Sequence, residues 1–166
     1  ELFETVDPEK KQDNEKTTEY DAIQGFGLVS LTDGIFLSGK SNMKRMQIFD
    51  RKILTNGDRW ERTFRIESEG CTSSYSSITL DYYDKPASVD CIKCRMNNLD
   101  LSVTKGTRVY YPNGHLQVQT TATSQRIRID DYNNGDEFVV KVVATNLESV
   151  DQKFAVVTTG CFAWSI

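Results

Sequence analysis

From Arg45 onward, apolar and polar residues alternate with a period of two. Because successive side chains of a β-strand point to opposite faces, this period indicates strands with one buried face. The apolar positions are Met46 and Ile48; Trp60, Phe64 and Ile66; Ile78, Leu80 and Tyr82; Leu99, Leu101 and Val103; Ile127 and Ile129; Phe138, Val140, Val142 and Ala144; Phe154 and Val156. Turn sequences such as Asn56-Gly57-Asp58 separate the runs. About eight or nine short strands at this spacing predict an all-β fold, an antiparallel β-sandwich or jelly roll.

The first 40 residues differ from this pattern. Residues 1–19 are rich in charge and predict an arm or long loop. Residues 20–40 contain a Gly-aromatic-Gly turn followed by a predicted short helix, with Ser30 as its N-cap and Gly39 at its end. The sandwich is expected to occupy residues 41–166.

The composition disfavours two classes of partner. The chain has 20 Lys and Arg against 24 Asp and Glu, a net charge of −4, and no basic cluster among aromatic residues, so nucleic acid is not expected. No apolar run approaches the roughly 18 residues that a membrane span needs.

Four cysteines, at positions 71, 91, 94 and 161, predict disulfides in an oxidising compartment. The Cys91-Ile-Lys-Cys94 segment has the spacing of half a zinc ribbon, but a second CxxC is missing. A thioredoxin-like redox motif is also disfavoured, because no βαβ pattern surrounds it. Counting alternating strands puts Cys91, Cys94 and Cys161 at one end of the sandwich. A bridge from Cys91 or Cys94 to Cys161 is therefore expected, with Cys71 free or paired outside this chain.

Oxygen-bearing side chains gather near two predicted strand ends. Asp84 ends one strand, and Asn97, Asn98 and Asp100 begin another. Such a set can surround Ca²⁺, and the same residue types also cap strands and initiate turns.

Adjacent tyrosines give a second candidate site. On a strand, one ring of Tyr82-Tyr83 or Tyr110-Tyr111 should point outward, so Tyr83 and Tyr111, with Trp164, could offer a stacking platform for a sugar. A half-exposed sheet face would use tyrosine in the same way.

The chain carries no catalytic motif. Its one histidine, His115, follows a Pro-Asn-Gly turn, and there is no Gly-x-Ser-x-Gly elbow and no phosphate-binding glycine loop. No catalytic residue is predicted.

Two regions resemble one protein family. The segment Gln24-Gly-Phe-Gly-Leu-Val29 and the predicted helix after it resemble the end of the catalytic domain of subtilisin-like serine peptidases, although Leu28 stands where that family has a basic residue. Five later segments resemble, in order, the C-terminal jelly roll of alkaline subtilisin-like proteases, which is similar in architecture to the P domain of proprotein convertases. They begin at Ile78 (ITLDYYDKPA), Asn97 (NNLDLSV), Tyr110 (YYPNG), Phe138 (FVVKVVATN) and Gln152 (QKFAVV).

The resemblance implies a non-catalytic accessory domain of a secreted or cell-surface protease, which stabilises the catalytic domain or shapes substrate access. Its partner would be the catalytic domain, upstream in the chain or held as a processed subunit. Some members of the family bind structural calcium, which makes Asp84, Asn98 and Asp100 candidate ligands. However, Asn98 replaces an aspartate of the family, and the stretch Leu116–Ser124 is short and lacks an acid. The alternative is a carbohydrate- or surface-binding module.

Overall fold

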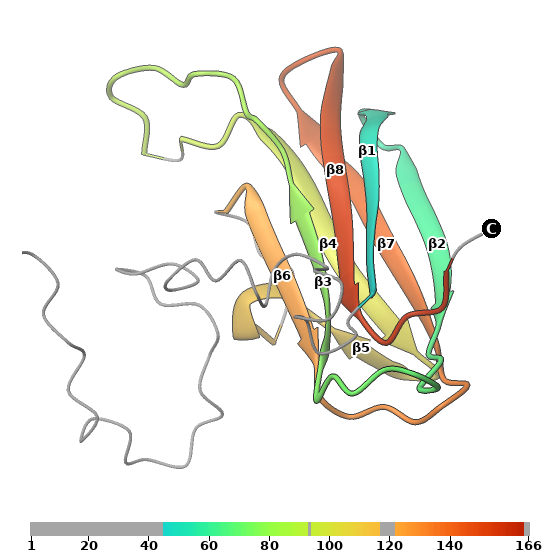
Figure 1. The fold of residues 1–166 in the computed structure, drawn as a ribbon. Helices are drawn as coiled ribbons and strands as arrows, with labels where there is room; N and C mark the ends of the chain where they lie inside the picture. The colour runs from blue at the N-terminus through green and yellow to red at the C-terminus, as the bar shows by residue number, and fades with distance from the viewer. Residues whose placement is uncertain (1–44, 93, 117–121, 165–166) are drawn as a thin grey trace, which may run out of the picture.

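The computed structural model describes residues 45–92, 94–116 and 122–164 (Figure 1). The predicted arm 1–19 and the predicted turn and helix in 20–40 lie outside these ranges. The described elements are β1 (Arg45–Thr55), β2 (Arg59–Arg65), β3 (Ser76–Asp81), β4 (Asn97–Lys105), β5 (Arg108–Tyr110), the short 3₁₀ helix η2 (Pro112–Gly114), β6 (Ser124–Ile129), β7 (Glu137–Leu147) and β8 (Asp151–Gly160). No helix in this part of the chain is long and apolar enough to cross a membrane.

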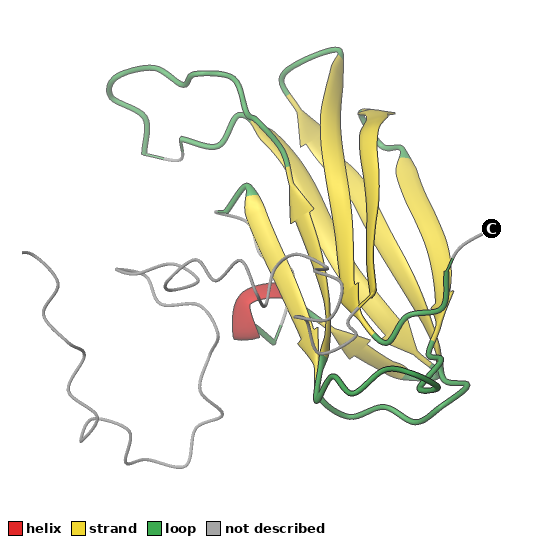
Figure 2. Cartoon of the chain, in the orientation of Figure 1, coloured by secondary structure: helices red, strands yellow, loops and turns green. Residues whose placement is uncertain are grey.

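The strands form two four-stranded antiparallel sheets, ordered β1-β8-β3-β6 and β2-β7-β4-β5, which pack face to face (Figures 1 and 2). Strands at equal distance before and after the β4–β5 turn pair with each other. These pairs are β4–β5, β3–β6, β2–β7 and β1–β8. The chain therefore folds back on itself as one long hairpin, which is rolled so that β8 also pairs with β3 and β7 with β4. This is the jelly-roll arrangement, and the predicted all-β sandwich is confirmed.

The core lies between the two sheets and follows the predicted alternation. Leu99, Leu101 and Val103 of β4 are fully buried, and so are Phe138, Val140 and Val142 of β7. Burying each such side chain contributes about 1.5–3 kcal/mol. Near the end of the sandwich where β2 and β8 finish, the rings of Phe64, Phe138 and Phe162 pack on one another, with centroids 5.6 and 6.3 Å apart.

The predicted faces of β1 are wrong. Ile48 was expected on an apolar face, yet 59% of it is exposed, whereas Gln47 is buried. Phe49 points toward the core instead and packs on the rings of Trp60 and Phe64. Gln47 is accommodated because its amide donates a hydrogen bond to the Ala163 carbonyl at 2.8 Å. A register shift between Phe49 and Lys52 then changes the alternation, which returns Leu54 to the core.

Gly160 leaves no room for a side chain. Its φ is +117°, and a Cβ there would lie 2.4 Å from Ser76 Oγ and 2.6 Å from Ser76 Cα. The contact brings the end of β8 against the start of β3, where the Cys161 amide donates to Ser76 Oγ at 3.0 Å. Only glycine combines this backbone angle with this contact.

Gly160→Ala should therefore lower the free energy of unfolding by about 3 kcal/mol or more, because backbone strain and steric overlap add. Gly57→Ala is the matched control, since Gly57 also has a positive φ, +85°, but faces open space. It should cost only about 1–2 kcal/mol. Urea unfolding measures both, and equal losses would contradict the steric argument.

Candidate functional site

The sandwich has two ends of different character. At the upper end, as drawn in Figure 1, β3 and β7 finish and β4 and β8 begin. At the lower end, β2 and β8 finish and β1 begins. The residues predicted as calcium ligands lie at or near the upper end.

Asp84 closes the base of the loop between β3 and β4. Its carboxylate accepts hydrogen bonds from the amides of Met96 at 2.6 Å and Asn97 at 3.0 Å. It also accepts from the amide of Lys85 at 2.9 Å. Both oxygens of Asp84 are thus used to hold the two ends of the loop together.

Asn97 continues this polar network into the β7–β8 turn. The side chain is buried, and its Oδ1 accepts from the amides of Glu148 and Ser149 at 2.9 and 3.1 Å. Its Nδ2 donates to Ser149 Oγ at 2.9 Å and to Gln152 Oε1 at 2.6 Å. Gln152 in turn donates to the Tyr83 carbonyl at 3.0 Å. Three chain segments are therefore joined at the upper end by side-chain amides.

Asn98 and Asp100 form a separate group on β4. The side-chain Nδ2 of Asn98 donates to Asp100 Oδ2 at 3.3 Å, and the Thr145 hydroxyl donates to the same oxygen at 2.6 Å. Arg95 Nη2 lies 3.9 Å from Asp100 Oδ1, and both side chains of this ion pair are more than nine-tenths buried. Two of the three predicted ligands thus meet, while Asp84 serves the loop.

Burial raises the pKa of Asp100, and the Thr145 hydroxyl and the Arg95 charge oppose this effect only in part. Oδ1 of Asp100 and Oδ1 of Asn98 are buried and accept no hydrogen bond from the described residues. Unsatisfied oxygens of this kind are what a cation would bind.

The surroundings nevertheless fit calcium poorly. Ca²⁺ needs about six to eight oxygens, and within the described residues no group of three or more His, Cys, Asp or Glu side chains could hold a metal ion. Arg95 already supplies the positive charge beside Asp100. Calcium stays a prediction that this arrangement does not favour.

The sequence did not point to Arg95 or Thr145. Arg95 directly precedes the Asn-rich start of β4, which is a weak local signal. The position of Thr145 depends on the pairing of β4 with β7, where the register shifts between Asn98 and Leu99. No local pattern reveals such a shift.

The predicted aromatic platform is not assembled. Tyr83 is 90% exposed at the upper end, whereas Trp164 follows β8 at the lower end. Tyr111 is half-buried, and neither it nor Tyr83 contacts another ring in the described chain. The three rings therefore offer no common surface for a sugar.

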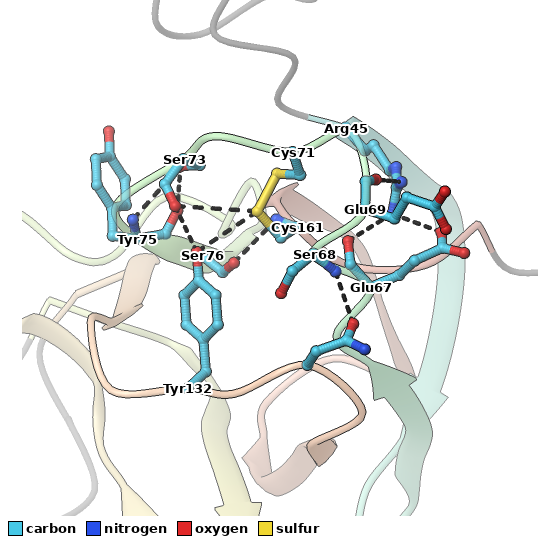
Figure 3. Close-up of a disulfide and its surroundings, with 11 residues drawn as sticks. Arg45, Glu67, Ser68, Glu69, Cys71, Ser73, Tyr75, Ser76, Tyr132 and Cys161 are labelled. Carbon is cyan, nitrogen blue, oxygen red and sulfur yellow. Dashed lines mark hydrogen bonds and ion pairs between the residues drawn. A yellow bond between two sulfur atoms is a disulfide. The ribbon is translucent and has the colours of Figure 1, made fainter.

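The predicted disulfide pairing is wrong. Cys71 bonds Cys161 at the lower end, with Cα atoms 5.6 Å apart, and Cys91 bonds Cys94 within the β3–β4 loop (Figure 3 shows the first bridge). The runs recognised in the sequence did not include the three-residue strand β5. Including β5 reverses the direction of every later strand, which moves Cys161 to the same end as Cys71.

Polar groups around the Cys71–Cys161 bridge hold the lower end (Figure 3). Arg45 lies between two acidic residues, donating to the carbonyls of Glu67 at 3.0 Å and Glu69 at 2.8 Å. Its guanidinium also pairs with the Glu67 carboxylate at 2.7 Å. A cavity of about 320 Å³ opens beside this group, lined by Arg65, Ile66, Glu67, Glu69, Asn134 and Ala163.

The sequence matches no model of a known protein family, and no curated protein matches it significantly.

Asp84→Ala should destabilise the domain by about 2–3 kcal/mol, because the amides of Met96 and Asn97 lose a charged acceptor. Asp90→Ala, which changes an exposed acid in the same loop, should stay within about 0.5 kcal/mol of wild type. Urea unfolding and the rate of tryptic cleavage within residues 85–95 measure the effect. Equal effects of the two changes would show that Asp84 does not close the loop.

The stability of Asp100→Asn relative to wild type should rise as the pH increases above about 4. The pKa of Asp100 is raised in the folded state above its ordinary value of 3.8. The folded state of wild type therefore holds the Asp100 proton more tightly than the unfolded state does. The stabilisation that this gives is complete below the unfolded pKa and is lost as the pH rises through the folded pKa. The attraction between Arg95 and ionised Asp100 is already part of this pKa shift, where it opposes the effect of burial.

Asp136→Asn is the matched control of opposite sign. The hydrogen bond from Lys105 is the main cause that lowers the pKa of Asp136. Wild-type Asp136 therefore stabilises the fold above its unfolded pKa, and this stabilisation is lost as the pH falls. The unfolding free energy of each variant minus that of wild type, plotted between about pH 3 and 7, should therefore have slopes of opposite sign for the two variants. Slopes of the same sign would refute the assignment.

Proposed function

We propose that this chain is the non-catalytic accessory domain of a subtilisin-like serine protease, which packs on the catalytic domain and stabilises it. The observation that carries the proposal is the agreement between motif order and fold. The five segments that carry the resemblance fall on β3, on β4, on the end of β5 with η2, on β7 and on β8. A jelly roll is the architecture that the resemblance implies.

The position of β1 supports a partner at the lower end. Residues 20–40, which resemble the end of a catalytic domain, precede Arg45, the first residue of β1, by only four residues. Four residues span at most about 15 Å, so a folded unit ending there would have to lie beside the lower end. The partner surface would then include the cavity beside Arg45.

Trp164 is the aromatic residue best placed to contact such a partner. It is 60% exposed, and the adjacent Ala163 amide donates to the Arg65 carbonyl at 2.8 Å, which fixes the chain at this point. Exposed tryptophans on a fixed backbone are frequent energetic centres of interfaces. Two disulfides also agree with a protein of the secretory pathway or cell surface.

The role of the domain would be mechanical. Burying the exposed Trp164 against the catalytic domain would favour the folded state of both, because a partner that binds only the folded form stabilises it. The catalytic triad would lie upstream, since the single histidine of this chain caps η2.

The proposal is tested by active-site labelling of the native source. The chain is captured under non-denaturing conditions and the eluate is treated with a fluorophosphonate probe for serine hydrolases. We expect a labelled species that is either a longer form of this chain or a co-purifying protein with subtilase motifs. An eluate in which this chain migrates alone, without label, would overturn the proposal.

The same assay tests the interface in a form where the domain is held as a separate subunit. Trp164→Ala should reduce the recovered label at least about tenfold, as expected for loss of a central interface tryptophan. Tyr83→Ala is the matched control, because Tyr83 is also an exposed aromatic residue but lies at the opposite end. Equal recovery from both variants would place the interface elsewhere.

A further inference from the structure

The two disulfides differ in ring size and in accessibility. Cys71 and Cys161 are 90 residues apart in sequence, and Cys161 is 1% exposed. Cys91 and Cys94 are three residues apart, and Cys94 is exposed. Because the constraint that a disulfide places on the unfolded chain grows with ring length, the small ring contributes less to folding. The Cys91–Cys94 bridge is therefore poorly explained as a structural element.

The small ring sits at the tip of a loop whose base is closed independently. The loop between β3 and β4 stands out from the upper end of the sandwich in Figure 1. Asp84 holds its base through the amides of Met96 and Asn97, and Arg95 is anchored by donating to the Ala122 carbonyl at 3.1 Å. Opening the disulfide would thus release only the tip.

The tip itself is open to a reaction partner. Val89 and Ile92 are fully exposed, and Cys94 itself is exposed. The Cys91 amide donates to the Ser88 carbonyl at 3.2 Å, which forms a turn that precedes the ring. A thiol approaching from solvent can therefore reach the sulfur of Cys94, whereas Cys91 is half-buried.

We propose that the Cys91–Cys94 disulfide is an exchange site for vicinal dithiols, either small molecules or the reduced CxxC of another protein. A thiolate of the dithiol attacks Sγ of Cys94, which forms a mixed disulfide and breaks the Cys91–Cys94 bond. The Cys91 thiolate that leaves takes a proton. The second thiol of the dithiol then loses its proton. It attacks the first sulfur of the dithiol, which is bonded to Cys94 in the mixed disulfide. The Cys94 thiolate is released and takes a proton. Two electrons and two protons pass to the protein, and the dithiol becomes a disulfide.

The loop base also allows the reverse reaction. It holds both ends of the segment after reduction, so the two thiols stay near each other. In the oxidised form their Cα atoms are 5.2 Å apart, within the range that a disulfide requires. A disulfide-bearing partner can then reoxidise the pair, while the buried Cys71–Cys161 bridge takes no part.

The test is reduction of the native protein followed by differential alkylation. The folded chain is treated with limiting dithiothreitol or, in a second arm, with reduced thioredoxin, and each cysteine is quantified by peptide mass spectrometry. We expect alkylation of Cys91 and Cys94 at least tenfold faster than that of Cys71 and Cys161, with the tertiary fold retained. Reaction in both arms identifies protein dithiols as substrates, and reaction with dithiothreitol alone limits the site to small dithiols.

A variant lacking the small ring provides the control. Cys91→Ala/Cys94→Ala should keep the urea midpoint close to that of wild type and should oxidise no dithiol under the same conditions. The proposal is overturned if all four cysteines react together, if Cys91 and Cys94 react only after unfolding, or if the double variant still oxidises the dithiol.

Discussion

The insertion of β8 between β1 and β3 is the constraint on which the rest of the structure depends. β8 is the last strand in sequence, yet it pairs on one side with the first strand and on the other with the third. Its Phe154 and Val156 point into the core against the opposite sheet. Until β8 is in place, β1 has no hydrogen-bonded neighbour in its sheet. Such long-range pairing must overcome a large loss of chain entropy, so the fold should form slowly for its size.

The end of β8 is secured by contacts that reinforce one another. Gly160 allows the backbone to approach Ser76, and the following Cys161 is bonded to Cys71. Phe162 then enters the ring cluster beside Phe64. Covalent, steric and apolar interactions thus hold the lower end. At the upper end the Trp60 and Phe154 rings also meet, with centroids 6.3 Å apart, and hydrogen bonds of Asp84, Asn97 and Gln152 join the loops.

The sequence predicted the parts of this fold that depend on local periodicity. Alternation placed the buried faces of β4 and β7 correctly because their pairing keeps one register from Leu99 to Thr104. It failed on β1, where a bulge reverses the faces and a buried glutamine replaces an expected aliphatic residue. The strand count also left out β5, which has only three residues, and that omission placed Cys161 at the wrong end of the sandwich.

The candidate site was predictable only to the level of residue type. Asp84, Asn98 and Asp100 were recognised as oxygen-bearing residues near strand ends, which they are. In the structure Asp84 closes the base of the loop, whereas Asn98 and Asp100 form a separate group. That group depends on Arg95 and Thr145, whose positions follow from tertiary pairing. Calcium and arginine satisfy a buried carboxylate by the same electrostatics, and a single sequence does not distinguish them.

The difference between the two ends bears on how the domain could serve two roles. A partner attached through residues before Arg45 would meet the end that is held by a long-range disulfide and a ring cluster. The loop that carries Cys91 and Cys94 follows β3 directly, at the opposite end. Because Asp84 isolates the loop tip from the strands, a chemical change at the tip need not reach the core or the lower end. The two functions proposed for this chain are therefore physically separable, and either could be lost without the other.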